Sequence, residues 1–149
     1  MKKGYAILLL MLSTVFYAQD KLATVDTKMT EVLALIEKGD VEKLKQLSTQ
    51  KMYCLQCFEN SQGKAPYLVD SKTFYKKHSS KIFNQDVLKR IKEGEKKIIT
   101  EEATTADYIA LYTIYKANEL AEGHEGMQFA FWFKEESGSL KLSGVETIP

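Results

Sequence analysis

The stretch MQFAFWF, residues 127–133, places Met, Phe, Phe and Phe at alternate positions. Alternate side chains of a β-strand point to the same face, so this spacing predicts a strand with one apolar face. Three further runs of β type lie at residues 97–100, 108–115 and 140–145, separated by breaks that contain Thr, Gly and Ser. The segment ESGS, residues 136–139, fits a hairpin connection. The last third of the chain is therefore predicted to be an antiparallel meander.

The first part of the chain has a helical period. Apolar residues recur at spacings of three and four between residues 24 and 38, Gly39 ends that pattern, and Asp40 can cap a second helix over residues 41–47. Short extended segments are expected at 52–58 and 66–69, followed by a third helix capped by Asp70 and a helical turn within residues 84–94. Helices first and strands last predict one α+β domain.

Residues 1–18 have the pattern of a secretory signal peptide. Lys2 and Lys3 precede an uncharged run over residues 5–16, and Ala18 is the expected cleavage position. The apolar run is shorter than the roughly 20 residues that cross a bilayer as a helix. Because no Cys lies near the junction, we expect a periplasmic or secreted protein without a lipid anchor, with one domain over residues 19–149.

The charge of the chain gives no sign of a polyanionic partner. Of the 21 basic and 20 acidic residues, cleavage removes only Lys2 and Lys3, so 19 basic residues face 20 acidic ones. They form no basic stripe along one face, so we expect neither nucleic-acid binding nor membrane binding after cleavage.

The closing segment FWFKEESGSLKLSGV, residues 131–145, and the order helix, helix, short strands, helix and meander resemble the nuclear transport factor 2 superfamily. That superfamily also contains ketosteroid isomerase and polyketide-cyclase-like proteins. The resemblance is one of pattern over residues 19–149. It implies a cone-like α+β barrel, in which the N-terminal helices pack on a strongly curved antiparallel sheet that leaves a cavity at the open end. It implies no reaction, because the fold hosts enzymes, binding proteins and scaffolds.

Aromatic residues are the candidates for lining that cavity, together with one histidine on the third helix. The residues expected to contact a ligand are Tyr53, Tyr75, His78, Tyr108, Tyr112, Phe129 and Phe131. An isomerase of the ketosteroid type needs an Asp base and a phenolic or acidic oxyanion donor. No Asp lies within an apolar strand face, so catalysis would depend on His78 with Tyr108 or Tyr112.

Cys54 and Cys57 are the only cysteines of the chain. On a regular strand their Cα atoms would be about 10 Å apart, beyond the roughly 7 Å limit for a disulfide. A disulfide therefore requires a turn at residues 55–56, and two packed thiols, a redox pair and a metal site are the alternatives. A zinc site would need two further ligands, and His78 and His124 are the only histidines of the chain. We expect no metal and no other cofactor.

These features favour an exported, non-enzymatic binding domain that takes a small apolar ligand or a segment of a protein partner in the cone cavity. An isomerase or hydratase that uses His78 and a cavity tyrosine is the first alternative. A structural protein that forms a homodimer through its sheet is the second.

Overall fold

The computed structural model describes residues 3–58, 67–101 and 105–149, and the side chains from residue 20 onward. The expected polar turn at residues 59–63 and the side chains of the expected signal peptide lie outside the described residues. In the order of the chain, the elements are α1 (Lys3–Lys38), α2 (Val41–Gln46), β1 (Ser48–Cys54), the 3-10 turn η1 (Leu55–Cys57), β2 (Leu68–Asp70), α3 (Ser71–Lys77), α4 (Ser79–Ile82), α5 (Gln85–Glu93), β3 (Lys96–Thr100), β4 (Tyr108–Tyr115), β5 (Met127–Glu136) and β6 (Ser139–Ile148).

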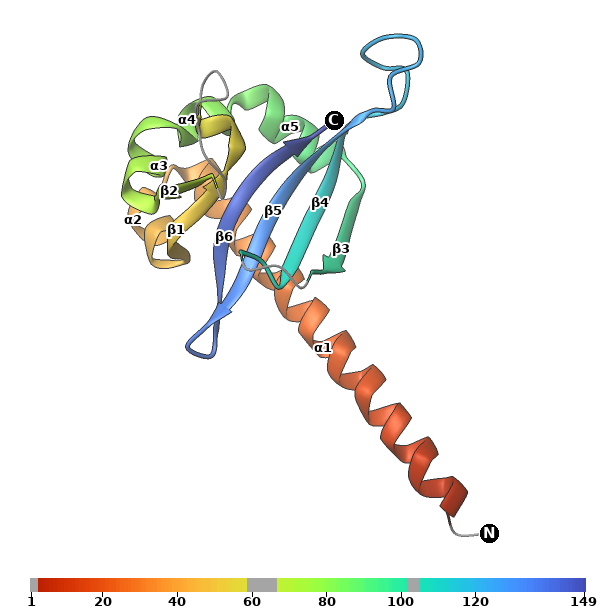
Figure 1. Ribbon diagram of the computed structural model, residues 1–149. Helices are drawn as coiled ribbons and strands as arrows, with labels where there is room; N and C mark the ends of the chain where they lie inside the picture. Colours follow the sequence, from red (N-terminus) through yellow and green to blue (C-terminus); the bar gives the residue numbers. More distant parts are fainter. Residues whose placement is uncertain (1–2, 59–66, 102–104) are drawn as a thin grey trace.

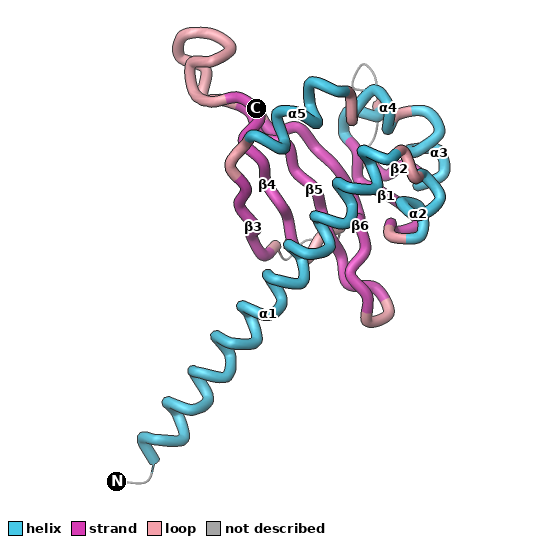
Figure 2. Tube along the Cα trace, turned by 180° about the vertical axis from the view of Figure 1, so that it is seen from behind, coloured by secondary structure: helices cyan, strands magenta, loops and turns pink. Residues whose placement is uncertain are grey.

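Six strands form one sheet in the order β2-β1-β6-β5-β4-β3. Figure 1 shows the sheet in front of the helices, and Figure 2, from behind, shows α1 and α5 across its other face. We call the side that carries the helices the helix face and the opposite side the open face. The predicted α+β class is confirmed.

Two details of the predicted sheet are corrected by the structure. The sheet is curved but does not close into a barrel. It is also mixed, because β1 pairs with β6 in parallel while the other neighbouring strands are antiparallel. The sequence of β1 cannot specify this partner, because its pairing depends on where α1 and α2 place it.

The core lies between the sheet and α1. Met29 and Val32 of α1 are fully buried, as the helical spacing predicted, while Leu33 and Ile36 are half-buried beside them. From the sheet, Phe129, Phe131 and Phe133 of β5 bury their rings on the helix face, together with Ala110, Tyr112 and Ile114 of β4. The alternating patterns of the two strands therefore face the helices.

Local signals in the sequence place the turns. Gly39 has φ +66° and is followed by Asp40, whose carboxylate accepts a hydrogen bond from the Lys43 N–H at 3.2 Å at the start of α2. Ser137 and Gly138 both have positive φ, as a two-residue hairpin of type I′ requires. The predicted helix junction and the predicted hairpin are confirmed.

The turn at η1 brings the two cysteines together. Cys54 and Cys57 form a disulfide, with Cα atoms 5.4 Å apart. The chain leaves the extended course directly after Cys54, which is the turn that the sequence required for this bond. In the part of the chain that the structure describes, no helix is both long enough and apolar enough to cross a membrane.

Candidate functional site

The helix face of the sheet is filled by aromatic rings where the sequence predicted a cavity. Phe129 and Phe131 are at most 1% exposed. Phe83, which follows α4, stacks on Phe131 with ring centroids 5.9 Å apart and planes within 3° of parallel. Tyr112 meets Phe131 edge-on at 5.9 Å. These rings pack against one another as core, so they are not free to contact a ligand held between them.

The structure separates the other predicted ligand contacts. Tyr108 and Tyr112 lie on β4 on the helix face, and Tyr112 also lines a groove of about 410 Å³ between α1, α5 and the sheet. His78 lies half-buried at the junction of α3 and α4. Tyr53 lies on the open face, because it alternates with the buried Met52 and Cys54 of β1. The predicted set therefore does not form one site.

Of the residues predicted to contact a ligand, Tyr75 lines a substantial apolar pocket. This pocket has a volume of about 490 Å³ and lies where the end of α1 and α2 meet α3, α4 and the start of α5. Its walls and rim are formed by Ile36, Gly39, Val41, Leu44, Tyr75, Ser79, Ser80, Phe83, Asn84 and Gln85. We call it the helix pocket. Apart from Tyr75, the analysis of the sequence did not select its residues, because they come from two stretches of the chain, 36–44 and 75–85, that only the fold brings together.

Two capping residues hold the segments that form the helix pocket. The left-handed Gly39 turns the chain so that α2 folds back beside α1, with the Asp40 N–H donating to the Leu35 carbonyl at 3.0 Å. On the opposite side, Asn84 caps α5 by accepting from the Val87 N–H at 3.0 Å. Because glycine has no Cβ atom, Gly39 adopts its positive φ without a steric cost.

The phenol of Tyr75 is held in a fixed direction. Ser48 Oγ donates to the Leu44 carbonyl at 2.7 Å, so its lone pairs remain to accept from the Tyr75 hydroxyl, also at 2.7 Å. Burial raises the pKa of Tyr75 to about 12, although the hydrogen bond with Ser48 acts in the opposite direction. At neutral pH this phenol is therefore uncharged, and it offers a polar edge to an apolar wall.

The isomerase alternative requires His78 to act together with a tyrosine. In the residues that the structure describes, no hydrogen bond joins the His78 side chain to a tyrosine, and His78 does not line the helix pocket. The pKa of Tyr112 is also raised to about 12, first by burial and then by Asp26. These observations give the catalytic alternative no geometric support.

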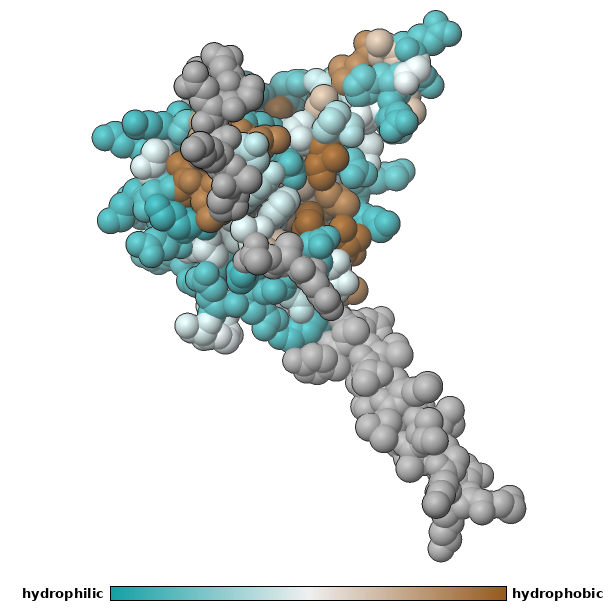
Figure 3. All heavy atoms as spheres, in the orientation of Figure 1, coloured by the Kyte–Doolittle hydropathy of each residue, from teal (hydrophilic) through white to brown (hydrophobic). Residues whose placement is uncertain are grey.

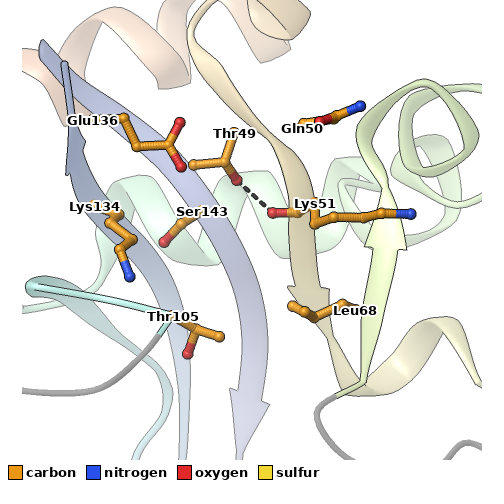
Figure 4. Close-up of a pocket in the computed structure, with 8 residues that line it drawn as sticks. All are labelled: Thr49, Gln50, Lys51, Leu68, Thr105, Lys134, Glu136 and Ser143. Carbon is orange, nitrogen blue, oxygen red and sulfur yellow. Dashed lines mark hydrogen bonds between the residues drawn. The ribbon is translucent and has the colours of Figure 1, made fainter.

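A second pocket lies on the open face, between β1, β6 and the end of β5. It has a volume of about 360 Å³ and is lined by Thr49, Gln50, Lys51, Leu68, Thr105, Lys134, Glu136 and Ser143 (Figure 4). We call it the sheet pocket. Gly144, next to Ser143 within the last strand, was the sequence signal for an irregularity here, because an isolated glycine in a strand often marks a bulge.

The open face also carries an apolar strip beside the sheet pocket. Its members are Ile99, Ala106, Ile109, Leu111, Ala130, Trp132 and Ile148. Figure 3 shows apolar atoms along β4 on this face. Tyr53 extends the strip, because its ring stacks on Trp132 with centroids 4.2 Å apart and planes within 5° of parallel.

Known proteins give no further assignment. No family model matches this chain. A search of the curated proteins gives no match either. Among the described residues, no group of three or more His, Cys, Asp and Glu side chains is placed to hold a metal ion. The functional argument therefore depends on the two pockets and the apolar strip.

Proposed function

We propose that this chain is an exported, non-enzymatic binding domain that takes a small apolar ligand, or an apolar side chain of a protein partner, in the helix pocket. The observation that carries this proposal is the pocket of about 490 Å³ with walls of Ile36, Leu44 and Phe83. Ligand sites in proteins are commonly clefts of about 300–1,000 Å³ with mostly apolar walls and a few polar groups.

The polar groups of the helix pocket support binding better than catalysis. The Ser79 hydroxyl donates to the Tyr75 carbonyl at 2.9 Å, and the Tyr75 hydroxyl is engaged by Ser48. Both groups are already hydrogen-bonded, so their role toward a ligand is to shape the wall. No acid and base face each other across the pocket among the residues that line it.

The size of the helix pocket limits the occupant. Burial of apolar surface supplies about 25 cal/mol for each Å² removed from water, so an occupant that fills the pocket gains most by presenting rings or aliphatic groups to Leu44 and Phe83. Ser80, Asn84 and Gln85 at the rim are partly or fully exposed and suit a polar end that remains in water.

Export is the second part of the proposal. It is supported by the order of charged, apolar and small residues in the first 18 positions and by the disulfide between Cys54 and Cys57. Expression of the full chain in a bacterium, followed by mass spectrometry of the periplasmic fraction, tests it. We expect a product that begins at Gln19. Recovery of only the unprocessed chain from the cytoplasm would contradict export.

The binding proposal is tested with the neutral fluorophore N-phenyl-1-naphthylamine. Its emission should rise saturably on addition of the purified protein. Ser80→Trp, at the exposed rim, should cover the pocket mouth and weaken binding about tenfold or more, a loss of about 1.4 kcal/mol. Lys76→Trp adds the same ring on the exposed surface of α3 and should bind as the wild type does. Equal binding by all three proteins, or no saturable binding, would overturn the proposal.

The apolar strip favours a second candidate function, which is association through the open face. Within the strip Ala106, Ile109 and Ala130 are buried, and Ile99, Leu111, Trp132 and Ile148 remain partly exposed. Apolar side chains gathered on one exposed face of a protein can mark an interaction site. Sedimentation velocity should then show a concentration-dependent dimer for the wild type and a monomer for Leu111→Lys. A wild-type monomer at high concentration would contradict this candidate and leave the helix-pocket proposal unaffected.

A further inference from the structure

The loop that connects β4 to β5, residues 116–126, projects from the body of the molecule. Figures 1 and 2 show it beyond the end of the sheet, pointing away from α2, α3 and α4. Residues 116–123 are all exposed. Hairpin loops commonly have about two to five residues, and much longer ones are often functional. We call this segment the projecting loop and treat it as a candidate contact surface.

Hydrogen bonds give the projecting loop a defined shape. The Asn118 N–H donates to the His124 carbonyl at 2.8 Å, and the Gly123 N–H donates to the Asn118 side-chain oxygen, also at 2.8 Å. At the base of the loop, the Arg90 guanidinium donates to the Glu119 carboxylate at 2.7 Å and so ties the loop to α5. The segment between these bonds is therefore ordered before it meets a partner, which lowers the entropic cost of docking.

Leu120 lies in that segment, at the far end of the projecting loop. It is 45% exposed, more than Leu55 or Leu68, the other large apolar side chains that are exposed in the described part of the chain. Figure 3 shows hydrophobic atoms on this projection among hydrophilic ones. A single exposed leucine is ordinary. This one is carried outward on a hydrogen-bonded loop, so it can enter a pocket of another molecule.

The charges of the projecting loop and of the helix pocket are opposite. Glu122 and Glu125 are exposed on the loop, which has no arginine and has its one lysine at the first position. Residues 75–85, which form one wall of the helix pocket, include the exposed Lys76 and Lys77 and no acidic residue. Within the described residues, none of these four charges is held in an ion pair. Opposite charges favour contact between the loop and this wall, and like charges disfavour contact between two loops.

We propose that Leu120 of one copy of this chain docks into the helix pocket of a second copy. This inference rests on the proposed function of the helix pocket and names the protein segment that occupies it. The leucine side chain packs against Leu44 and Phe83, while Glu122 and Glu125 face the wall that carries the lysines. Because loop and pocket are different surfaces, the contact is head-to-tail, and repetition of it gives a ring or an open chain of copies.

The test is sedimentation velocity over a wide range of protein concentration. The wild type should form species larger than a monomer as its concentration rises. Leu120→Ser removes the docking side chain and Ser80→Trp covers the pocket mouth, so each variant alone should associate about tenfold more weakly or worse. Leu55→Ser removes a leucine that is 41% exposed outside the loop and is the matched control, which should associate as the wild type does.

A mixture of the two defective variants gives the sharpest result. The Leu120→Ser copy keeps its pocket and the Ser80→Trp copy keeps its loop, so the mixture should form a one-to-one dimer and nothing larger. A wild type that stays monomeric, association that survives in Leu120→Ser, or a mixture without a dimer would overturn the inference. Association that is lost in Leu111→Lys but kept in Leu120→Ser would assign the contact to the open face instead.

Dye binding separates this inference from the function on which it rests. Leu120→Ser leaves the helix pocket intact, so it should bind N-phenyl-1-naphthylamine at least as tightly as the wild type does. Saturable dye binding without any association of the wild type would overturn only the docking of Leu120. Absence of saturable dye binding in both proteins would overturn the proposed function of the helix pocket.

Discussion

Replacement of Ser143 by alanine should make the free protein more stable. The substitution keeps the Cβ atom and removes only the hydroxyl, which is buried and has no partner among the described residues. Because an unsatisfied buried hydroxyl costs about 1–3 kcal/mol, its removal should raise the free energy of unfolding by about 1 kcal/mol or more. For a domain of this size, that corresponds to an increase in the melting temperature of about 4 °C.

The matched control is Ser48→Ala. The Ser48 hydroxyl donates to the Leu44 carbonyl and accepts from Tyr75, both at 2.7 Å, so its removal takes a hydrogen-bond partner from each of these two groups. We expect this variant to lose about 1–2 kcal/mol. Thermal and urea denaturation followed by circular dichroism measure both variants against the wild type, and an unchanged urea m-value would confirm that the unfolded states are comparable.

The two serine variants should therefore move in opposite directions. A loss of stability in Ser143→Ala similar to that in Ser48→Ala would refute the reasoning, because it would show that the Ser143 hydroxyl is satisfied in the free protein.

Three further predictions concern the sheet, the disulfide and Tyr75. Gly144→Ala should lower the free energy of unfolding by about 2 kcal/mol or more in urea denaturation, because the new methyl group meets Tyr53 at 2.7 Å; wild-type stability would show that β1 can move away from β6. Reduction of the Cys54–Cys57 disulfide should cost about 2 kcal/mol, the chain-entropy value for so short a loop, and identical urea curves with and without dithiothreitol would disprove this contribution. The pKa of Tyr75 should be about 12 in the folded protein and about 10 in the unfolded chain. The folded state therefore holds this proton more tightly, and the contribution of Tyr75 to stability should fall as pH rises from about 10 to about 12. A near-ultraviolet absorbance titration of the wild type and of Tyr75→Phe measures the ionisation, and identical titration curves would contradict the prediction.

The side chains of Tyr53 and Glu146 are hydrogen-bonded to each other, and their environment raises the pKa of both groups. The Tyr53 hydroxyl donates to the Glu146 carboxylate at 3.2 Å. Burial and the nearby Glu146 charge raise the pKa of Tyr53 to about 12. Burial also raises the pKa of Glu146, against the opposite effect of the hydrogen bond. The contribution of Glu146 to stability is therefore greatest when its carboxyl group is protonated. It decreases as pH rises from the ordinary pKa of a glutamate through the raised pKa of the folded protein.

Local signals in the sequence were sufficient to predict most of the elements. The strand over residues 108–115 has the bounds that its pattern predicted, because it is long and its apolar residues alternate. Gly39 with Asp40, and Ser137 with Gly138, each impose a turn through backbone geometry that few other residue pairs allow. Such features depend on neighbouring residues and hence can be found in one sequence.

The features of the fold that the sequence did not predict depend on contacts between distant segments. β1 begins at Ser48 rather than Met52, since Ser48 pairs with Leu142 of β6 and Lys51 pairs with Asp70 of β2. The sequence also could not show that the ring of Phe83 would lie on Phe131 and fill the predicted cavity. Whether a set of aromatic residues lines a cavity or a core depends on how the rings fit together, which residue types alone do not determine.

The most direct test of the helix pocket as the binding site is methyl NMR of protein labelled with ¹³C at Ile, Leu and Val, titrated with N-phenyl-1-naphthylamine. The account predicts that the methyl signals of Ile36, Val41 and Leu44 shift together and saturate, while those of Leu142 and Val145 in the core stay unchanged. Shifts at Leu142 and Val145 without shifts at Leu44 would place the probe between the sheet and the helices and would contradict the account.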